Sequence, residues 1–150
     1  MTLTLNLTNI TDAISQLSVT GVTFKDYDGV ASNWQSTPNV FYPNPENFIT
    51  GFEIRYPAIQ QGGDSPADVM YTLNYRLLGT AVGNLGNFSE AYADIVEKAA
   101  AVLAKIIETD SPYSGTVEMK AHGFSIGART DPAGNSYHGA DIAVSIVEQH

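Results

Sequence analysis

The residues best suited to acid–base or nucleophilic chemistry are few and lie scattered along the chain. His122, His138 and His150 lack the H-x-H or H-E-x-x-H spacing of a metal site. His138 and Asp141 stand three residues apart where an expected turn meets an expected strand, and strand geometry would put them on opposite faces. No G-x-S-x-G turn supplies a nucleophile beside them. We therefore interpret both as exposed turn residues and assign no catalytic residue.

Motifs known from metal and phosphate sites are incomplete in this sequence. Residues 26–29 (Asp-Tyr-Asp-Gly) resemble the start of a calcium loop, but Thr37 stands where that loop needs a bidentate glutamate. The glycines of residues 79–86 precede an expected helix, yet no Lys-Ser or Lys-Thr pair follows them as in a phosphate loop. Asp64 and Asp68 flank a polar loop without the apolar surroundings that raise a carboxyl pKa. We expect no metal, no cofactor and no enzymatic activity.

The composition restricts the possible partners. The chain has 150 residues, and seven Lys and Arg against 16 Asp and Glu give a net charge of −9. Such a chain is a poor neutraliser of phosphates, so specific nucleic-acid binding is not expected. It has no cysteine, which excludes disulfides and thiolate metal sites. Charged residues make up 15% of the chain, against about 25% in typical domains, so the surface is polar but largely uncharged and suits contacts between protein subunits.

No targeting or membrane segment is expected. The first residues lack the basic and continuous apolar regions of a signal peptide. No apolar run reaches the ~18 residues that a membrane-spanning helix needs. We expect the protein to be made in the cytoplasm of the producing cell and to have no membrane partner.

Hydrophobic periodicity predicts the elements that position these residues. One apolar stripe predicts a short helix over residues 6–18, and a wider one predicts a long helix over 89–109. The clearest strand spans residues 68–78, where apolar and polar residues alternate, and further strands are expected over 21–27, 48–56, 115–128 and 140–148. The sequence thus predicts a single α+β domain over residues 1–150. Its mixed, mostly antiparallel sheet of about five strands carries the long helix and the short N-terminal helix on one face.

A long segment without any period spans residues 30–47. It contains three prolines, four asparagines and the aromatic residues Trp34, Phe41 and Tyr42. Two interpretations are open: a surface loop pinned by its own aromatics, or an arm that becomes ordered against a partner. Aromatic side chains often anchor interfaces, so we take these three as candidate contacts with a neighbouring subunit. Arg55 and Arg76 are candidates for ion pairs across a subunit boundary, with local surface pairs as the alternative.

The order of these elements resembles the tail-terminator (tail-completion or neck) proteins of long-tailed bacteriophages. The resemblance rests on four features. The first two are the short first helix and the Tyr-Pro-Ala-Ile motif at residues 56–59, which follows a strand. The others are the alternating strand at residues 69–77 and a long helix followed by strands, the last of which includes Tyr-His-Gly-Ala-Asp-Ile-Ala-Val at residues 137–144. It spans nearly the whole chain, although none of these motifs is diagnostic by itself.

The resemblance implies a structural virion protein located at the head-proximal end of the tail. Members form a ring, usually a hexamer, that caps the tail tube, stops its polymerisation and offers a surface to head-completion (connector) proteins, while DNA passes through the lumen without specific binding. The candidate interface residues are Trp34, Phe41, Tyr42, Arg55, Arg76, Arg129 and Tyr137. The alternatives are a head-completion or other tail structural protein, and a small cytosolic α+β enzyme or ligand-binding module.

Overall fold

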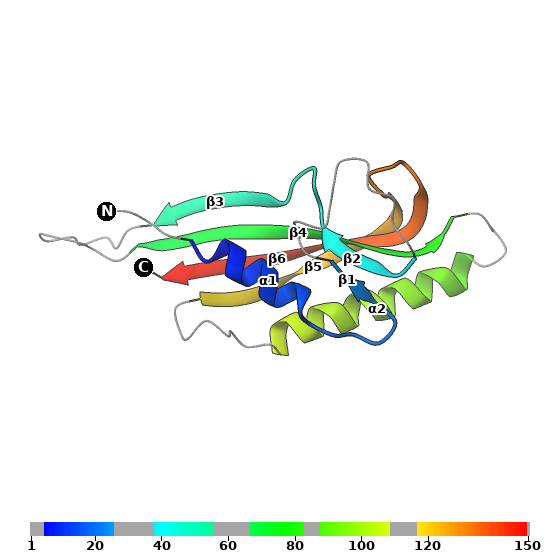
Figure 1. Cartoon of the computed structure of the whole chain (residues 1–150), viewed down its shortest axis with the longest axis horizontal. Coiled ribbons are helices and arrows are strands. Elements are labelled where there is room, and N and C mark those ends of the chain that lie inside the picture. The colour runs from blue at the N-terminus through cyan, green and yellow to red at the C-terminus, as the bar shows by residue number, and fades with distance from the viewer. Residues whose placement is uncertain (1–4, 26–37, 56–66, 83–87, 109–116, 150) are drawn as a thin grey trace, which may run out of the picture.

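The computed structural model describes residues 5–25, 38–55, 67–82, 88–108 and 117–149. Six strands form one sheet, in which β1-β2-β4-β6-β5 are neighbours in that order and β3 also pairs with β4 (Figure 1). β1 and β2 are parallel and the other pairs are antiparallel. The elements along the chain are α1 (Leu7–Ser15), β1 (Thr23–Phe24), β2 (Val40–Pro43), β3 (Ile49–Arg55), β4 (Asp68–Ala81), α2 (Phe88–Glu108), β5 (Val117–Thr130) and β6 (Ser136–Gln149).

Strand β4 is the centre of the sheet. β6 pairs with one side of it from Asp68 to Ala81. On its other side β2 pairs with residues 75–78, and β3 pairs with residues 68–73. The alternating sequence of β4 explains its position, because every second side chain is apolar and can face a core. Its buried side chains on that face are Val69, Tyr71, Leu73, Tyr75 and Leu77.

Both helices pack on this apolar face of the sheet. Ile10 and Ile14 of α1 and Ile95, Val102 and Ile106 of α2 join one core cluster with the buried residues of β4 and β6. Figure 1 shows both helices on the same side of the sheet. We call the opposite side the open face, because neither α1 nor α2, the two helices of the described residues, covers it. It carries Thr72, Asn74 and Arg76 of β4 and Asp141, Ala143 and Ser145 of β6, all of them only partly buried.

A buried carboxylate fastens α1 to the end of β6. Glu148 has no exposed surface, since it follows the core-facing residues of β6 in the same alternation. Its Oε1 accepts hydrogen bonds of 2.8 Å from the backbone N–H and from the side-chain amide of Asn6, the N-cap residue of α1. Its Oε2 accepts a 2.5 Å hydrogen bond from the Tyr71 hydroxyl. The negative charge thus lies at the positive end of the helix dipole.

The expected fold class is wrong. Strands dominate the described residues, since β4, β5 and β6 have 14 residues each, whereas α1 has nine and α2 has 21. The sheet has six strands rather than about five, and Figure 1 shows β5 and β6 curling towards the turn that joins them. The described residues are therefore mostly a curled sheet with helices over part of one face, rather than a domain in which one long helix covers a sheet of about five strands. Hydrophobic periodicity predicted too few residues in strands, because the alternation of apolar and polar residues is lost where a strand bends or changes the face that it buries.

The segment expected as a loop over residues 30–47 contains strand β2. Phe41 and Tyr42 are 0% and 1% exposed, and the Phe41 ring stacks on Tyr75 with 4.7 Å between centroids. All four residues of β2 are buried, so no apolar–polar alternation marks this strand in the sequence. Trp34 lies outside the described residues. Among the residues that are described, no helix combines the length and the hydropathy needed to cross a bilayer.

Candidate functional site

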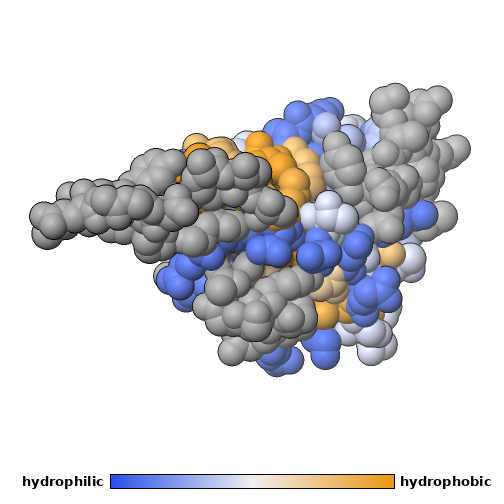
Figure 2. Space-filling view, turned by 60° about the vertical axis from the view of Figure 1, so that its left-hand side comes forward, coloured by the Kyte–Doolittle hydropathy of each residue, from blue (hydrophilic) through white to orange (hydrophobic). Residues whose placement is uncertain are grey.

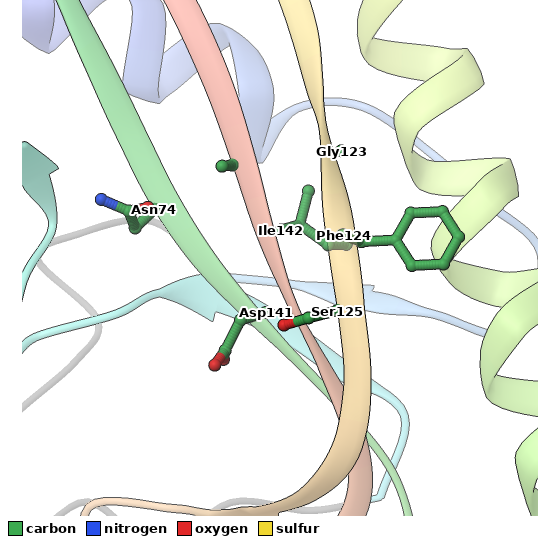
Figure 3. Close-up of a pocket in the computed structure, with 7 residues that line it drawn as sticks. Asn74, Gly123, Phe124, Ser125, Asp141 and Ile142 are labelled. Atoms are coloured by element: carbon green, nitrogen blue, oxygen red, sulfur yellow. The ribbon is translucent and has the colours of Figure 1, made fainter.

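The open face contains a hollow where small side chains meet. Asn74, Ala143 and Gly123 are neighbours across β4, β6 and β5. A Cβ atom placed on Gly123 would find no other atom within 4 Å, so the space above this glycine is empty. The hollow has a volume of about 410 Å³ and is lined by Asn74, Gly123, Phe124, Ser125, Asp141, Ile142 and Ala143. In Figure 3, Ser125 and Asp141 lie side by side on one side of the strands and Phe124 points away from them.

Asp141, which lines this hollow, is held by two guanidinium groups. Asp141 Oδ1 accepts a 2.8 Å hydrogen bond from Arg76 Nε, and its Oδ2 accepts one of 2.8 Å from Arg129 Nε. The side chains of Arg76 and Arg129 are 15% and 21% exposed, whereas that of Asp141 is 38% exposed. Burial by itself would lower the pKa of Arg76, but the hydrogen bond and charge of Asp141 raise it. The Arg76 guanidinium therefore stays charged beside the carboxylate of Asp141.

Two glycines make room for the Arg129 side chain to lie across the sheet. A Cβ atom on Gly127 would come within 2.7 Å of Arg129 Nη1, and one on Gly139 would come within 3.2 Å of Arg129 Cβ. Arg129 Nη2 also donates a 3.1 Å hydrogen bond to Ser125 Oγ. The backbone and these partners fix the position of the guanidinium, which in turn holds Ser125 and Asp141, two residues that line the hollow.

The second notable surface is the edge strand β3. All seven of its residues are exposed, although three of them are large and apolar: Ile49 at 41%, Phe52 at 52% and Ile54 at 39%. Ile49 pairs with Leu73 and Ile54 with Val69, so both lie on the helix-covered face of the sheet. The Phe52 ring stacks on Tyr71 with 6.1 Å between centroids. Figure 2 shows hydrophobic side chains reaching the surface in one view of the molecule.

An irregularity in β3 brings its apolar residues to one face. The register with β4 shifts between Thr50 and Glu53, and Gly51 in this interval has a φ of +64°, which favours glycine. The only charged residues of β3 pair with each other, since Arg55 Nε donates a 3.0 Å hydrogen bond to Glu53 Oε1. This edge therefore presents apolar side chains, a backbone unpaired within the described residues, and a neutralised ion pair.

The structure brings together some of the candidate interface residues, but through contacts within the chain. Arg76 and Arg129 meet at Asp141, and Arg55 pairs with Glu53. The three arginines thus form ion pairs within the chain, which agrees with the alternative of local pairs rather than pairs across a boundary.

The candidate aromatic contacts belong to the interior. Phe41 lies in the main core, while Tyr42 and Tyr137 form a smaller cluster with Val40 and Leu78. With 7% or less of each of these aromatics exposed, their interpretation as surface anchors is wrong. The short strand β2 and the long hairpin of β5 and β6 bury them.

The structure also locates the residues considered for acid–base and metal chemistry. Both oxygens of Asp141 accept hydrogen bonds from arginines, and His138 pairs with Ala128 on β5. Asp68 lies at the start of β4 opposite Arg55. Residues 26–29 and Asp64 lie outside the described ranges. In the part of the chain that the structure describes, no three His, Cys, Asp or Glu side chains are grouped to hold a metal ion.

Sequence reasoning missed the residues that form the two surfaces. Neither Phe52 nor Gly123 is among the candidate interface residues that the sequence suggests. The hollow could have been predicted only from the pairing of two small residues, Gly123 and Ala143, on neighbouring strands. Recognising that pair requires the register of the two strands to be known. The signal for Glu148 was available, because this acidic residue continues the apolar parity of Ile142, Val144 and Ile146.

Comparison with known proteins assigns no family. Neither a protein-family model nor a curated protein matches this chain.

Proposed function

We propose that this protein is a structural subunit that assembles with copies of itself into a ring, in the role of a bacteriophage tail terminator. The ring would cap the tail tube, end its polymerisation and offer the surface on which the head is joined. DNA would pass through the ring without being held. The proposal combines the family resemblance of the sequence with the surfaces described above.

The edge strand β3 is the observation that supports self-assembly most directly. An edge strand with exposed apolar side chains is a template for association, and soluble proteins usually protect such edges with charges, prolines or covering elements. Here Ile49, Phe52 and Ile54 are each 39% to 52% exposed, and Glu53 and Arg55 neutralise each other. A strand of this kind is suited to be covered by another subunit.

The charges support the idea of a conduit that does not grip DNA. Binding to nucleic acid depends on cationic side chains that are free to neutralise phosphates. All three arginines of the chain hydrogen bond to carboxylates of the same chain. The net charge of −9 repels phosphate further.

Electron microscopy and solution mass test this proposal together. The purified chain, alone and mixed with tail tubes that lack their terminator, is imaged by negative stain and weighed by sedimentation velocity. We expect ring-shaped particles, or density from the chain on one end of each tube, and tubes that no longer elongate. A chain that remains monomeric at all concentrations and does not bind tube ends would overturn the proposal.

A further inference from the structure

We propose that the exposed Phe52 edge of one subunit docks into the Gly123–Ala143 hollow on the open face of the next subunit. The occupant of the hollow is thus a second copy of this chain. This inference rests on the proposed self-assembly and names the surfaces that carry it.

The two surfaces complement each other in shape. Phe52 is the most exposed residue of the three large apolar ones on β3, with 52% of its surface accessible. The hollow of about 410 Å³ has small side chains or none at its base, because Ala143 and Gly123 are neighbours in register. Aromatic side chains that fill a pocket are the usual energetic centres of protein interfaces. An aromatic ring above Gly123 would meet no side chain of that residue.

The two surfaces also point in opposite directions, which determines the kind of assembly. Ile49 and Ile54 lie on the helix-covered face of β3, and the Phe52 ring stacks on Tyr71 of that same face. The hollow lies on the open face of the same sheet. A contact between such surfaces is heterologous, since each subunit uses one surface on each neighbour. It leaves one surface free at each end until the assembly closes into a ring.

Electrostatics favour contact at these two places in an acidic protein. Two copies with a net charge of −9 repel each other, so they approach best where carboxylates are already neutralised. On β3, Glu53 is paired with Arg55 at 3.0 Å. At the hollow, Asp141 is held between Arg76 and Arg129 at 2.8 Å each. Each surface therefore presents its acidic group with a compensating cation in place.

Cross-linking tests the proximity of the two surfaces, and the absence of cysteine makes the test specific. Ile54→Cys, which leaves Phe52 in place, and Ala143→Cys are made as separate chains, mixed, and treated with a short bismaleimide. We expect about a hundredfold more linked pairs than for the control mixture of Tyr92→Cys with Ala143→Cys, because thiols at an interface meet at roughly millimolar effective concentration. Tyr92 is a suitable control because it is an aromatic residue of similar exposure, 48%, on α2.

A complementation experiment tests the direction of assembly. Phe52→Ser removes the ring, and Ala143→Phe fills the hollow with a side chain directed to the open face. Each variant alone should lose assembly in sedimentation velocity, whereas Tyr92→Ser should keep it. A mixture of the two variants retains one intact contact, so it should give pairs of chains and nothing larger. Circular dichroism melting curves verify that each variant is folded.

The outcomes separate this inference from the proposed function. Linked pairs at the control level overturn the inference, even if rings are seen by microscopy and the terminator role stands. Linked 54–143 pairs together with variants that pair only when mixed support it, whether or not tail tubes are bound. If Phe52→Ser and Ala143→Phe both assemble like the unmodified chain, the inference is wrong.

Discussion

The hydrogen bonds of Glu148 lead to a quantitative prediction for the stability of the fold. This fully buried carboxylate accepts hydrogen bonds from the backbone and side chain of Asn6 and from the hydroxyl of Tyr71. Glu148→Ala removes both acceptor oxygens, and with them all three hydrogen bonds, and leaves a cavity. Glu148→Gln keeps the size of the side chain, since its oxygen can accept the bonds from Asn6 and its amide can donate to the Tyr71 oxygen. Comparing the two separates the loss of charge from the loss of partners.

The magnitude follows from the exposure of each donor. Tyr71 is 3% exposed, so its hydroxyl cannot reach water once Glu148 is gone, whereas the partly buried Asn6 can be hydrated in part. A buried donor without a partner costs about 1–3 kcal/mol. We therefore expect Glu148→Ala to lower the free energy of unfolding by about 3 kcal/mol. Glu148→Gln should cost about 1 kcal/mol, because a hydrogen bond to a charged group exceeds a neutral one by roughly that amount.

Urea denaturation followed by circular dichroism measures both variants. With a slope of about 2 kcal/mol/M, the midpoint should fall by about 1.5 M for Glu148→Ala and by about 0.5 M for Glu148→Gln. Protein concentration is held constant, because self-assembly adds to apparent stability. A double-mutant cycle with Tyr71→Phe isolates the hydroxyl contact. If Glu148→Ala costs under about 1 kcal/mol, or if both variants cost the same, the carboxylate does not hold α1 as argued.

Three further predictions concern titration, the ion-pair cluster and close packing. Burial raises the pKa of Tyr42 from 10.0 to about 12. Between these two pH values the native chain keeps a proton that the unfolded chain releases, so the free energy of unfolding should fall as the pH rises from 10 towards 12. Tyr42→Phe should show a shallower fall in urea titrations at alkaline pH, and an identical fall would contradict this. Asp141→Asn leaves two guanidinium groups facing each other and should lower the free energy of unfolding by about 1–2 kcal/mol. Added salt should restore part of this loss, because salt screens the repulsion between the two groups. A loss that does not depend on salt would point to packing instead. Gly139→Ala puts a Cβ atom 2.6 Å from the backbone oxygen of Leu77. This clash should lower the free energy of unfolding by about 2 kcal/mol. A neutral effect in thermal melts would show that β4 and β6 can move apart without cost.

Some elements were predictable from the sequence because local periodicity and tertiary burial agree in them. The alternation of residues 68–78 identified β4 and its core-facing side chains. The wide apolar stripe of residues 89–109 coincides with α2, at Phe88–Glu108. In both cases one face of the element is buried and the other is solvated, which is the condition under which a pattern is readable.

Other features were not predictable because they depend on pairing between distant strands. β2 is buried on both faces, so its four residues show no alternation, and Phe41 was assigned to a surface. Arg76 and Arg129 share Asp141 because Arg76 is its neighbour on β4, while Arg129, which pairs with Tyr137, reaches it across Gly127 and Gly139. The hollow likewise depends on Gly123 lying opposite Ala143. Such features follow from register, which a single sequence constrains weakly.

The position of β6 in the chain has a consequence for synthesis. This strand lies between β4 and β5 and pairs with both of them. Its Glu148 also accepts a hydrogen bond from Asn6, which lies 142 positions earlier in the chain. During translation the apolar face of β4 remains without its main partner until residues 136–149 have left the ribosome. Contacts between positions so distant in sequence form slowly, and unpaired strands invite aggregation meanwhile. The hollow is lined by residues of β4, β5 and β6, so it forms only after β6 has taken its place between the other two strands.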